Sequence, residues 1–405
     1  MRSHLHFSAK RVLAAACVAA MTGFLGCSAA DPGPAGSGSS TGSGAPATGG
    51  SSSGNGASSG TSGGGTAGGT TSPGTGGTGG TGGTTPGGTG TPAGGASGTV
   101  SADETWASGK QITGALVIAP GVTVTIDPGA AITVADGAKI TVGGTLKGKS
   151  TAAAHAKLTG AAWTGIVVEQ GGTLGLDGVD LVNAVTALDV KGGNTAATFS
   201  NGVITAPTSP FSVAIGGKLA IDHSSVTGTK GMSSVGGSFT ASFLSYDSGG
   251  NEGISLGDPS AILTIDDSKF FGTGNTSGDM ISSSQAASIH FGHSEISRVH
   301  CAFHFNNVTS FDISYATIHD NSYGFMLYGS GSTGTRSVGF SNIFSNASYG
   351  ADEGSAQTVN GLMTFHDGYW AKNGATTANN INKTTNAITV TNMSTTTPVA
   401  SVGPR

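Results

Sequence analysis

We predict an all-β domain from this sequence of 405 residues. Its expected architecture is a right-handed, three-sided parallel β-helix of about 10–12 coils, stacked at the usual strand spacing of about 4.8 Å. Two observations predict this fold: an apolar–polar alternation that recurs every eight residues, and its return in the same form after 24 residues. A third observation, a long uncharged stretch upstream, predicts that the domain follows a disordered tether rich in Gly, Ser and Thr.

The first 26 residues are predicted to be a signal peptide. A basic segment ends at Lys10 and Arg11, and an apolar run of about a dozen residues follows it. Such a run is too short to span about 30 Å of hydrocarbon, which takes about 20 helical residues. The segment therefore predicts export of the mature chain.

The stretch "FLGCS" resembles the lipobox of bacterial lipoproteins, in which a cysteine after a small residue is lipidated. Gly26 and Cys27 match that pattern. The resemblance implies a lipidated Cys27 and a partner membrane reached through the lipid anchor, with the chain at the outer membrane or cell surface. The alternative is cleavage after Ala30, which would release a secreted soluble protein.

Residues 27–100 are predicted to form a disordered linker behind the anchor. No charged residue lies between Pro32 and Ala102, and the segment consists mostly of Gly, Ser, Thr, Ala and Pro. It has almost no apolar surface to bury against the entropy lost on ordering. We expect the folded domain to span 101–398, with 399–405 as a C-terminal tail.

The repeat is clearest in "VTVTIDPGAAITVADGAKITVGG", which starts at Val122. Each eight-residue step is a short strand followed by a turn that contains Gly or Asp. Three steps return the chain to its starting side, so Leu116 should lie under Ile140 in the next coil. Parallel pairing then needs no helix, because the other two sides of the triangle supply the connection.

Later coils repeat one pattern in degenerate form. It consists of apolar–x–apolar, then a small or acidic residue, and a further apolar residue five positions after the second apolar one. It appears in "LAIDHSSV", "LTIDDSKF", "IHFGHSEI" and "FDISYATI". The spacing between copies of this pattern indicates coils of about 22–27 residues.

These patterns resemble the right-handed parallel β-helix (pectin-lyase-like) superfamily, in particular its surface lipoprotein members. "LVIAPGVTVTIDPGAAITVADGAKITVGGTLKG" is similar to their opening turns, "WTGI" to a first full coil and "HDGYWAKNG" to a closing element. The uncharged linker resembles those of myxobacterial lipoproteins. The resemblance implies the fold and leaves the activity open, because this superfamily includes lyases, hydrolases, adhesins and passive spacers.

Asp222 and Asp266 are the candidate catalytic residues. Both follow the inward anchor of their coil, and Ser242 is expected between them. Two coils would separate the carboxylates by about 10 Å, which is too far for a retaining pair and near the limit for an inverting one. The sequence therefore favours a non-catalytic protein, and a polysaccharide lyase or glycoside hydrolase is the alternative.

His300, His304 and Tyr328 are the candidate ligand-binding residues. Alternation in "VHCAFHF" turns both histidines outward and Cys301 inward. The expected outward column on this face consists of Ser282, His304, Met326 and Asp352. It brings no two metal ligands onto adjacent coils, so we expect no metal site and no cofactor.

Charge excludes one partner class. The formal net charge is −5, and no basic residues cluster in the domain, so nucleic acid is not an expected partner. Aromatic residues make up 6% of the chain, and the sequence shows no regular outward aromatic stripe. The expected function is binding of extracellular polysaccharide or contact with cell-surface material.

Overall fold

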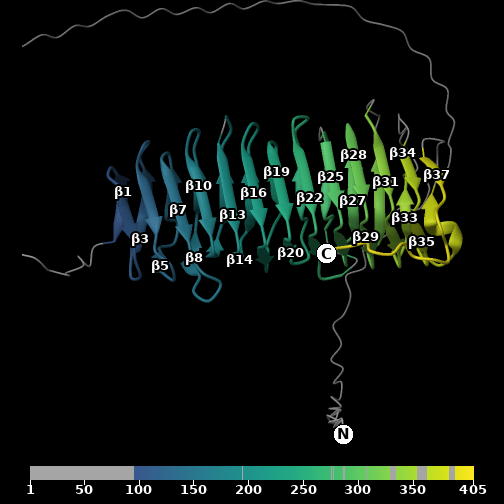
Figure 1. The fold of residues 1–405 in the computed structure, drawn as a ribbon, viewed down its shortest axis with the longest axis horizontal. Coiled ribbons are helices and arrows are strands. Elements are labelled where there is room, and N and C mark those ends of the chain that lie inside the picture. The colour runs from purple at the N-terminus through teal and green to yellow at the C-terminus, as the bar shows by residue number, and fades with distance from the viewer. Residues whose placement is uncertain are drawn as a thin grey trace, which may run out of the picture. The chain divides into compact units, whose positions relative to one another are not determined.

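The structure is a computed structural model that describes residues 95–193, 195–274, 276, 278–285, 288–306, 308–328, 334–353, 363–382 and 388–405. The predicted signal peptide, Cys27 and the linker through residue 94 lie outside these residues. The described part is all-β, with a single 3-10 helix, η1 (Thr377–Asn380), and forms a parallel β-solenoid of about 11 turns (Figure 1). The predicted fold class is confirmed.

From β3 onward, each strand pairs in parallel with the strand three places later in the chain, which gives the solenoid three faces. The first face is a 13-stranded sheet. Its strands are β2 (Glu104–Trp106), β4 (Thr123–Ile126), β7 (Thr145–Lys149), β10 (Thr173–Asp177), β13 (Ala196–Ser200), β16 (Lys218–Asp222), β19 (Ser238–Ser242), β22 (Ile262–Asp266), β25 (Ser288–Gly292), β28 (Ser310–Ser314), β31 (Arg336–Gly339), β34 (Met363–His366) and β37 (Ile388–Thr391).

The second and third faces are joined at β3. This long strand pairs with β5 on the second face and with β1 and β6 on the third. The second face contains β5 (Ala131–Val134), β8 (Ala156–Trp163), β11 (Val179–Ala184), β14 (Val203–Thr205), β17 (Ser225–Thr227), β20 (Ser245–Asp247), β23 (Lys269–Phe271), β26 (Glu295–Ser297), β29 (Thr317–His319), β32 (Asn342–Phe344) and β35 (Tyr369–Ala371). The third face contains β1 (Ala96–Val100), β3 (Gln111–Ile118), β6 (Lys139–Val142), β9 (Gly165–Val168), β12 (Thr186–Val190), β15 (Ser209–Val213), β18 (Ser233–Val235), β21 (Ile254–Leu256), β24 (Ile281–Ser283), β27 (Cys301–Asn306), β30 (Tyr323–Tyr328), β33 (Tyr349–Asp352) and β36 (Ile381–Asn382).

Alternating side chains fill the interior of the triangle, as the eight-residue repeat predicts. Leu116 pairs directly with Ile140, and both are buried. In the later turns the core contains a continuous series of packed aromatic rings, which are Phe211, Phe239, Tyr246, Phe270, Phe291, Phe303, Phe325 and Phe365. Each buried ring removes a large apolar area from water, so consecutive turns stabilise one another.

Each turn from β13 onward leaves the first face through a residue with a left-handed backbone. These residues form one column along the corner: Asn201, His223, Phe243, Asp267, His293, Tyr315, Phe340, Asp367 and Asn392. A left-handed conformation costs a residue other than glycine about 1 kcal/mol or more. Stacking offsets part of this cost, because the His293 and Tyr315 rings lie 4.6 Å apart and nearly parallel.

Buried asparagines form a ladder inside another corner, where the second face meets the third. The Nδ2 of Asn321 donates to Oδ1 of Asn346 at 3.0 Å, and Asn346 donates in the same way to Asn373 at 2.9 Å. Asn373 donates onward to Asn380 at 3.1 Å. Their amides also bond backbone groups, so the ladder satisfies polar groups that the corner buries.

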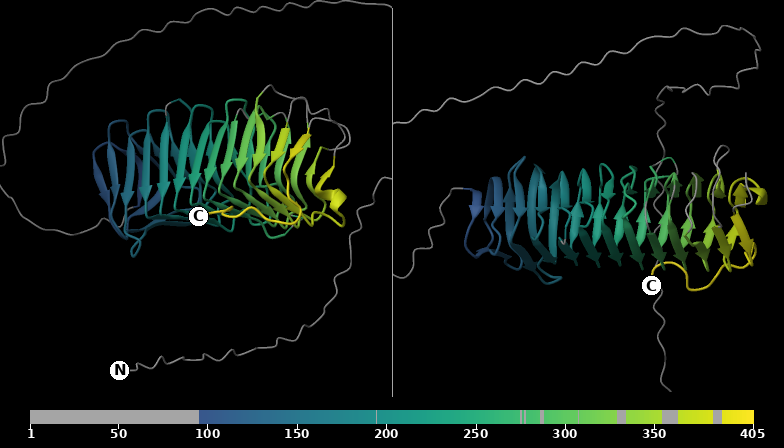
Figure 2. Two further views of the ribbon diagram at one scale, coloured as in Figure 1. Left: turned by 45° about the vertical axis from the view of Figure 1, so that its right-hand side comes forward. Right: turned by 90° about the horizontal axis from the view of Figure 1, so that it is seen from above.

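The last residues run back along the solenoid instead of leaving it (Figures 1 and 2). Val399 exchanges two hydrogen bonds with the side chain of Asn342. Gly403 donates to the carbonyl of Tyr315, and Arg405 bonds the Asp267 carboxylate. The predicted tail therefore packs across several turns.

The pair of Glu295 and His319 on the second face predicts a pH-dependent stability. Their side chains lie 3.3 Å apart, which raises the pKa of His319 and lowers that of Glu295. The histidine contribution is lost as pH rises through its raised pKa, and the glutamate contribution is lost as pH falls through its lowered pKa. Both contributions to stability are fully present between about pH 4.5 and pH 6.5, which are the ordinary pKa values of glutamate and histidine.

We therefore expect His319→Gln to destabilise the fold by about 1 kcal/mol within that window. The deficit should shrink as the pH rises above this window and wild-type His319 loses its proton. Urea denaturation of both proteins across this pH range measures the difference. A deficit that does not vary with pH would contradict the role of this pair.

Candidate functional site

The candidate catalytic residues occupy equivalent positions at the ends of first-face strands, as predicted. Asp222 pairs with Ser242, and Ser242 pairs with Asp266 on the next turn. The two carboxylates therefore lie two turns apart, about 10 Å at the usual strand spacing. The structure does not bring them together as a pair around one bond.

Hydrogen bonding shows that Asp222 is a poor general acid. Slight burial would raise its pKa, but hydrogen bonds from Ser242, at 2.6 Å, and His223 outweigh this effect and lower the pKa. Asp266 instead contacts His290, which also contacts Asp312 on the following strand. The lowered pKa keeps Asp222 ionised, and an ionised carboxylate cannot donate the proton that a glycosidic leaving group needs.

The three candidate ligand-binding residues all lie on the third face, where His304 contacts Tyr328. His304 lies in register between Ser282 and Met326, as predicted, and its ring centroid is 5.3 Å from that of Tyr328. His300 directly precedes β27 and packs edge-on against Tyr323. Met326 pairs in turn with Asp352 on the next strand of this face, as predicted.

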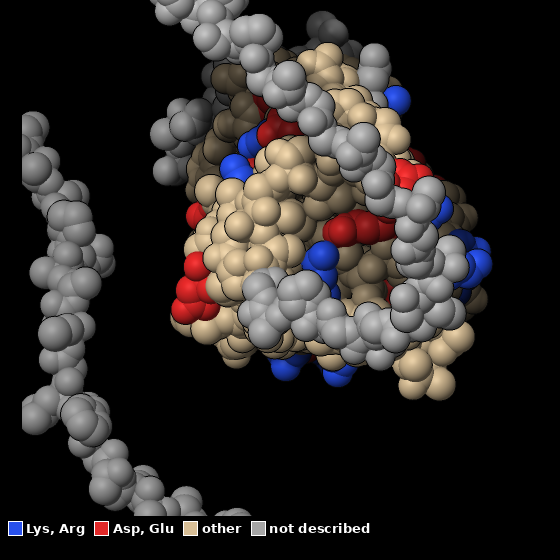
Figure 3. Space-filling view, turned by 90° about the vertical axis from the view of Figure 1, so that its left-hand side faces the viewer, with Lys and Arg blue, Asp and Glu red and all other residues tan. Residues whose placement is uncertain are grey.

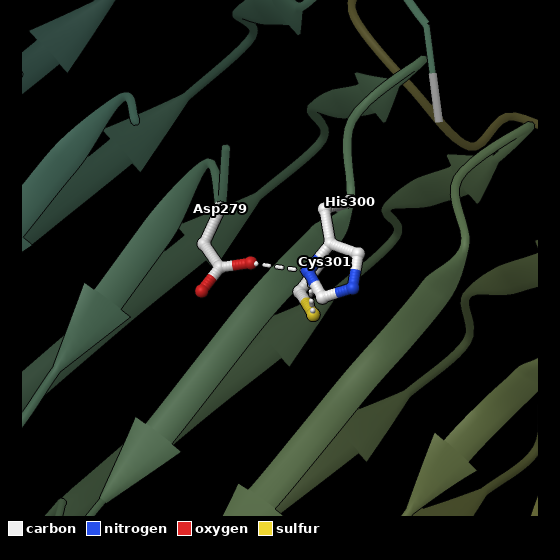
Figure 4. Close-up of side chains that lie close together, drawn as sticks. All are labelled: Asp279, His300 and Cys301. Carbon is white, nitrogen blue, oxygen red and sulfur yellow. Dashed lines mark hydrogen bonds and ion pairs between the residues drawn. The ribbon is translucent and has the colours of Figure 1, made fainter. Parts of the chain in front are cut away.

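Asp279 connects the two histidines, and the sequence analysis missed it. Its Oδ1 lies 3.0 Å from Nδ1 of His300 (Figure 4). Its Oδ2 lies 2.6 Å from Nδ1 of His304. Cys301 completes the group, with its Sγ 3.3 Å from Nδ1 of His300. We name Asp279, His300, Cys301 and His304 the acid–histidine cluster.

Strand register explains how Asp279 reaches this position. Ile281 pairs with Phe303, and the amide of Met280 donates to the carbonyl of Cys301. Extending that register upstream by two residues places Asp279 beside Cys301. Asp279 precedes β24, so it lies outside the apolar alternation from which strand register can be predicted.

The electrostatics of the acid–histidine cluster favour an ionised carboxylate and a neutral thiol. Burial would raise the pKa of Asp279, but hydrogen bonds from His304, His300 and Cys301 lower it to about 2. Burial raises the pKa of the Cys301 thiol, and the charge of Asp279 raises it further. Cys301 is fully buried, as predicted, and as a free thiol it is a poor nucleophile.

Half-buried tyrosines surround the acid–histidine cluster. Tyr323 stacks on Tyr349 of the next turn with ring centroids 6.2 Å apart. Tyr328 lies at the opposite edge of the face, where burial raises its pKa and the charge of Asp352 adds to the effect. We define the third-face patch as His300, His304, Tyr323, Tyr328 and Tyr349.

The expectation of no outward aromatic stripe needs correction at the left-handed corner. Phe243 stacks on His223, and Tyr315 stacks between His293 and Phe340. Alternation could not predict this arrangement, because these rings project from the corner rather than from strands.

A separate hollow of about 340 Å³ opens at the N-terminal end of the solenoid (Figure 3). Acidic and basic side chains lie together around it. Glu104 accepts hydrogen bonds from Trp106 and from Lys110, whose Nζ lies 5.8 Å from the Trp106 ring. These contacts cover the buried Trp106 at the end of the core, which is a structural role.

Comparison of the chain with family models, curated proteins and solved structures finds no match. Within the described part of the chain, no helix has the length and apolar character needed to cross a membrane. The parallel β-helix therefore rests on the strand pairing itself, and the resemblance to surface lipoproteins stays a prediction.

Proposed function

We propose that this chain is a non-catalytic β-helix that binds extracellular polysaccharide through its third face. The observation that carries the proposal is the convergence of aromatic rings and hydrogen-bonding groups in the third-face patch. Tyr323 and Tyr349 stack in register, and Tyr328 flanks His304 across the same sheet.

The chemistry of the patch suits a hydroxylated ligand. Ring faces and edges of tyrosine pack against the apolar surface of a sugar, while their hydroxyl groups exchange hydrogen bonds with it. The histidine nitrogens of the patch add donors and acceptors of fixed direction. Side chains on regular strands are held more firmly than side chains on loops, which favours binding.

Display from the cell surface forms the second half of the proposal. Lipidation of Cys27 would anchor the chain in the outer membrane, and the Gly/Ser/Thr-rich linker would let the β-helix reach extracellular material. Mass spectrometry of the mature protein tests this half. We expect an acylated peptide that begins at Cys27, and an unmodified peptide that begins at Asp31 would contradict it.

Replacing Tyr349 with alanine tests the binding half. Loss of one stacked ring should remove about 1.4 kcal/mol of binding free energy, which is about a tenfold weaker affinity. Affinity electrophoresis against acidic and neutral polysaccharides identifies a retained polymer, and titration calorimetry then measures the variant.

Tyr315→Ala is the matched control, because Tyr315 is also a partly exposed tyrosine but lies on the left-handed corner. It should bind as the wild type does. Equal loss in both variants, or none in Tyr349→Ala, would contradict binding at the third face.

A further inference from the structure

We infer that Asp279, His300 and Cys301 form a binding site for one divalent transition-metal ion of the zinc class, with His304 orienting Asp279. The site lies in the acid–histidine cluster (Figure 4). The inference is independent of polysaccharide binding, since it rests on the ligand atoms alone.

The three ligand atoms already lie close to the spacing that a tetrahedral ion requires. One carboxylate oxygen, one imidazole nitrogen and the sulfur all lie within 4.8 Å of one another. Metal bonds of about 2.0–2.3 Å in a tetrahedral site set neighbouring ligand atoms about 3.3–3.7 Å apart. The observed separations are 3.0 Å between Asp279 and His300 and 3.3 Å between His300 and Cys301, so small movements admit an ion.

The two carboxylate oxygens of Asp279 have different partners. Oδ2 is 2.6 Å from His304, which fixes the orientation of the carboxylate. Oδ1 points toward His300 on the side where Cys301 lies. A metal-ligating carboxylate held by a hydrogen bond from a neighbouring group is the usual supporting arrangement in protein metal sites.

The donor set selects the class of ion. Sulfur and imidazole favour zinc and its neighbours in the first transition row, whereas magnesium and calcium require oxygen ligands. Three protein ligands leave a fourth position for water, and the His300 side chain is 42% exposed, which gives the ion a path to the site. On binding, a metal–sulfur bond replaces the S–H bond of Cys301, and the proton leaves to solvent.

Cobalt(II) titration of the full chain, stripped of metal with a chelator, tests the site. We expect one equivalent to bind with the visible bands of four-coordinate cobalt and a thiolate-to-cobalt charge-transfer band. Zinc should displace the cobalt and abolish both signals. No variant changes any cysteine other than Cys301, so a change in the charge-transfer band reports Cys301 alone.

Cys301→Ser should lose the charge-transfer band, and Asp279→Asn should lose tight binding. His304→Gln should keep the band but bind about 10–100-fold more weakly, as expected for a residue that supports a ligand. His223→Gln is the matched control, because His223 also pairs with an aspartate, at 2.8 Å, but belongs to no group of three possible metal ligands among the described residues. It should bind as the wild type does.

Thermal melting distinguishes lost binding from lost folding. Zinc should raise the melting temperature of the wild type and of His223→Gln and leave that of folded Cys301→Ser unchanged. A folded wild type that binds no cobalt would overturn the inference. A charge-transfer band that survives in Cys301→Ser, or unchanged affinity in Asp279→Asn, would also overturn it.

Discussion

Val134→Asp is expected to unfold the opening turns of the solenoid at a cost of several kcal/mol. Val134 is 1% exposed and pairs in register with Ile112, so the new carboxylate would enter the core without a partner. Burying an unpaired charge is among the few single changes that exceed about 4 kcal/mol. Urea denaturation followed by circular dichroism measures the loss.

Thr133→Asp is the matched control, because Thr133 is the adjacent residue of β5 and points outward into solvent. Introducing a carboxylate at this exposed position should alter the free energy of unfolding by less than about 0.5 kcal/mol. Similar stabilities for the two variants would contradict the inward position of Val134.

Asn346→Ala should cost about 3 kcal/mol or more, because Asn346 is an interior member of the asparagine ladder. Its loss removes the acceptor for Asn321 and the side-chain donor to Asn373. It also removes the acceptor for the backbone N–H of Asn321. All three asparagines are buried. Each unsatisfied buried group costs about 1–3 kcal/mol. Thermal and urea unfolding measure the total.

Ser345→Ala provides the comparison, since Ser345 is the preceding residue and is half buried. We expect a change of less than about 1 kcal/mol there. If Asn346→Ala is as mild as this control, the ladder does not hold the corner together.

The fold was predictable because each turn repeats one physical requirement. Two alternating apolar residues of each strand must face the same interior. Residues 24 apart in the opening repeat therefore pair directly in adjacent turns, as Leu116 does with Ile140. The later register from Ser282 to His304 and Met326 was predictable for the same reason. Burial fixes register wherever one side of a strand faces a core.

The corners were not predictable by this reasoning, because polar groups and backbone strain determine them. Asn321 and Asn346 read as ordinary turn residues, although both are fully buried. Arg336 breaks the alternation outright: it occupies an inward position between Phe311 and Met363, where burial lowers its pKa. Apolar periodicity contains no information about such exceptions.

The candidate site was predictable in part. Outward alternation in one strand predicted His300 and His304, and Tyr328 was a candidate because of its aromatic ring. Asp279 was missed because it lies just upstream of its strand, where side chains follow no periodic pattern. It changes the chemistry of the site most, since it converts two separate histidines into one connected group.

One assay tests the central claim, that the β-helix binds polysaccharide without cleaving it. The purified chain is incubated with acidic and neutral polysaccharides, and retention is measured together with new reducing ends and unsaturated products. We predict retention of at least one polymer with no products. Product formation that disappears in Asp222→Ala or Asp266→Ala would contradict the account and assign the protein to the polysaccharide-degrading enzymes.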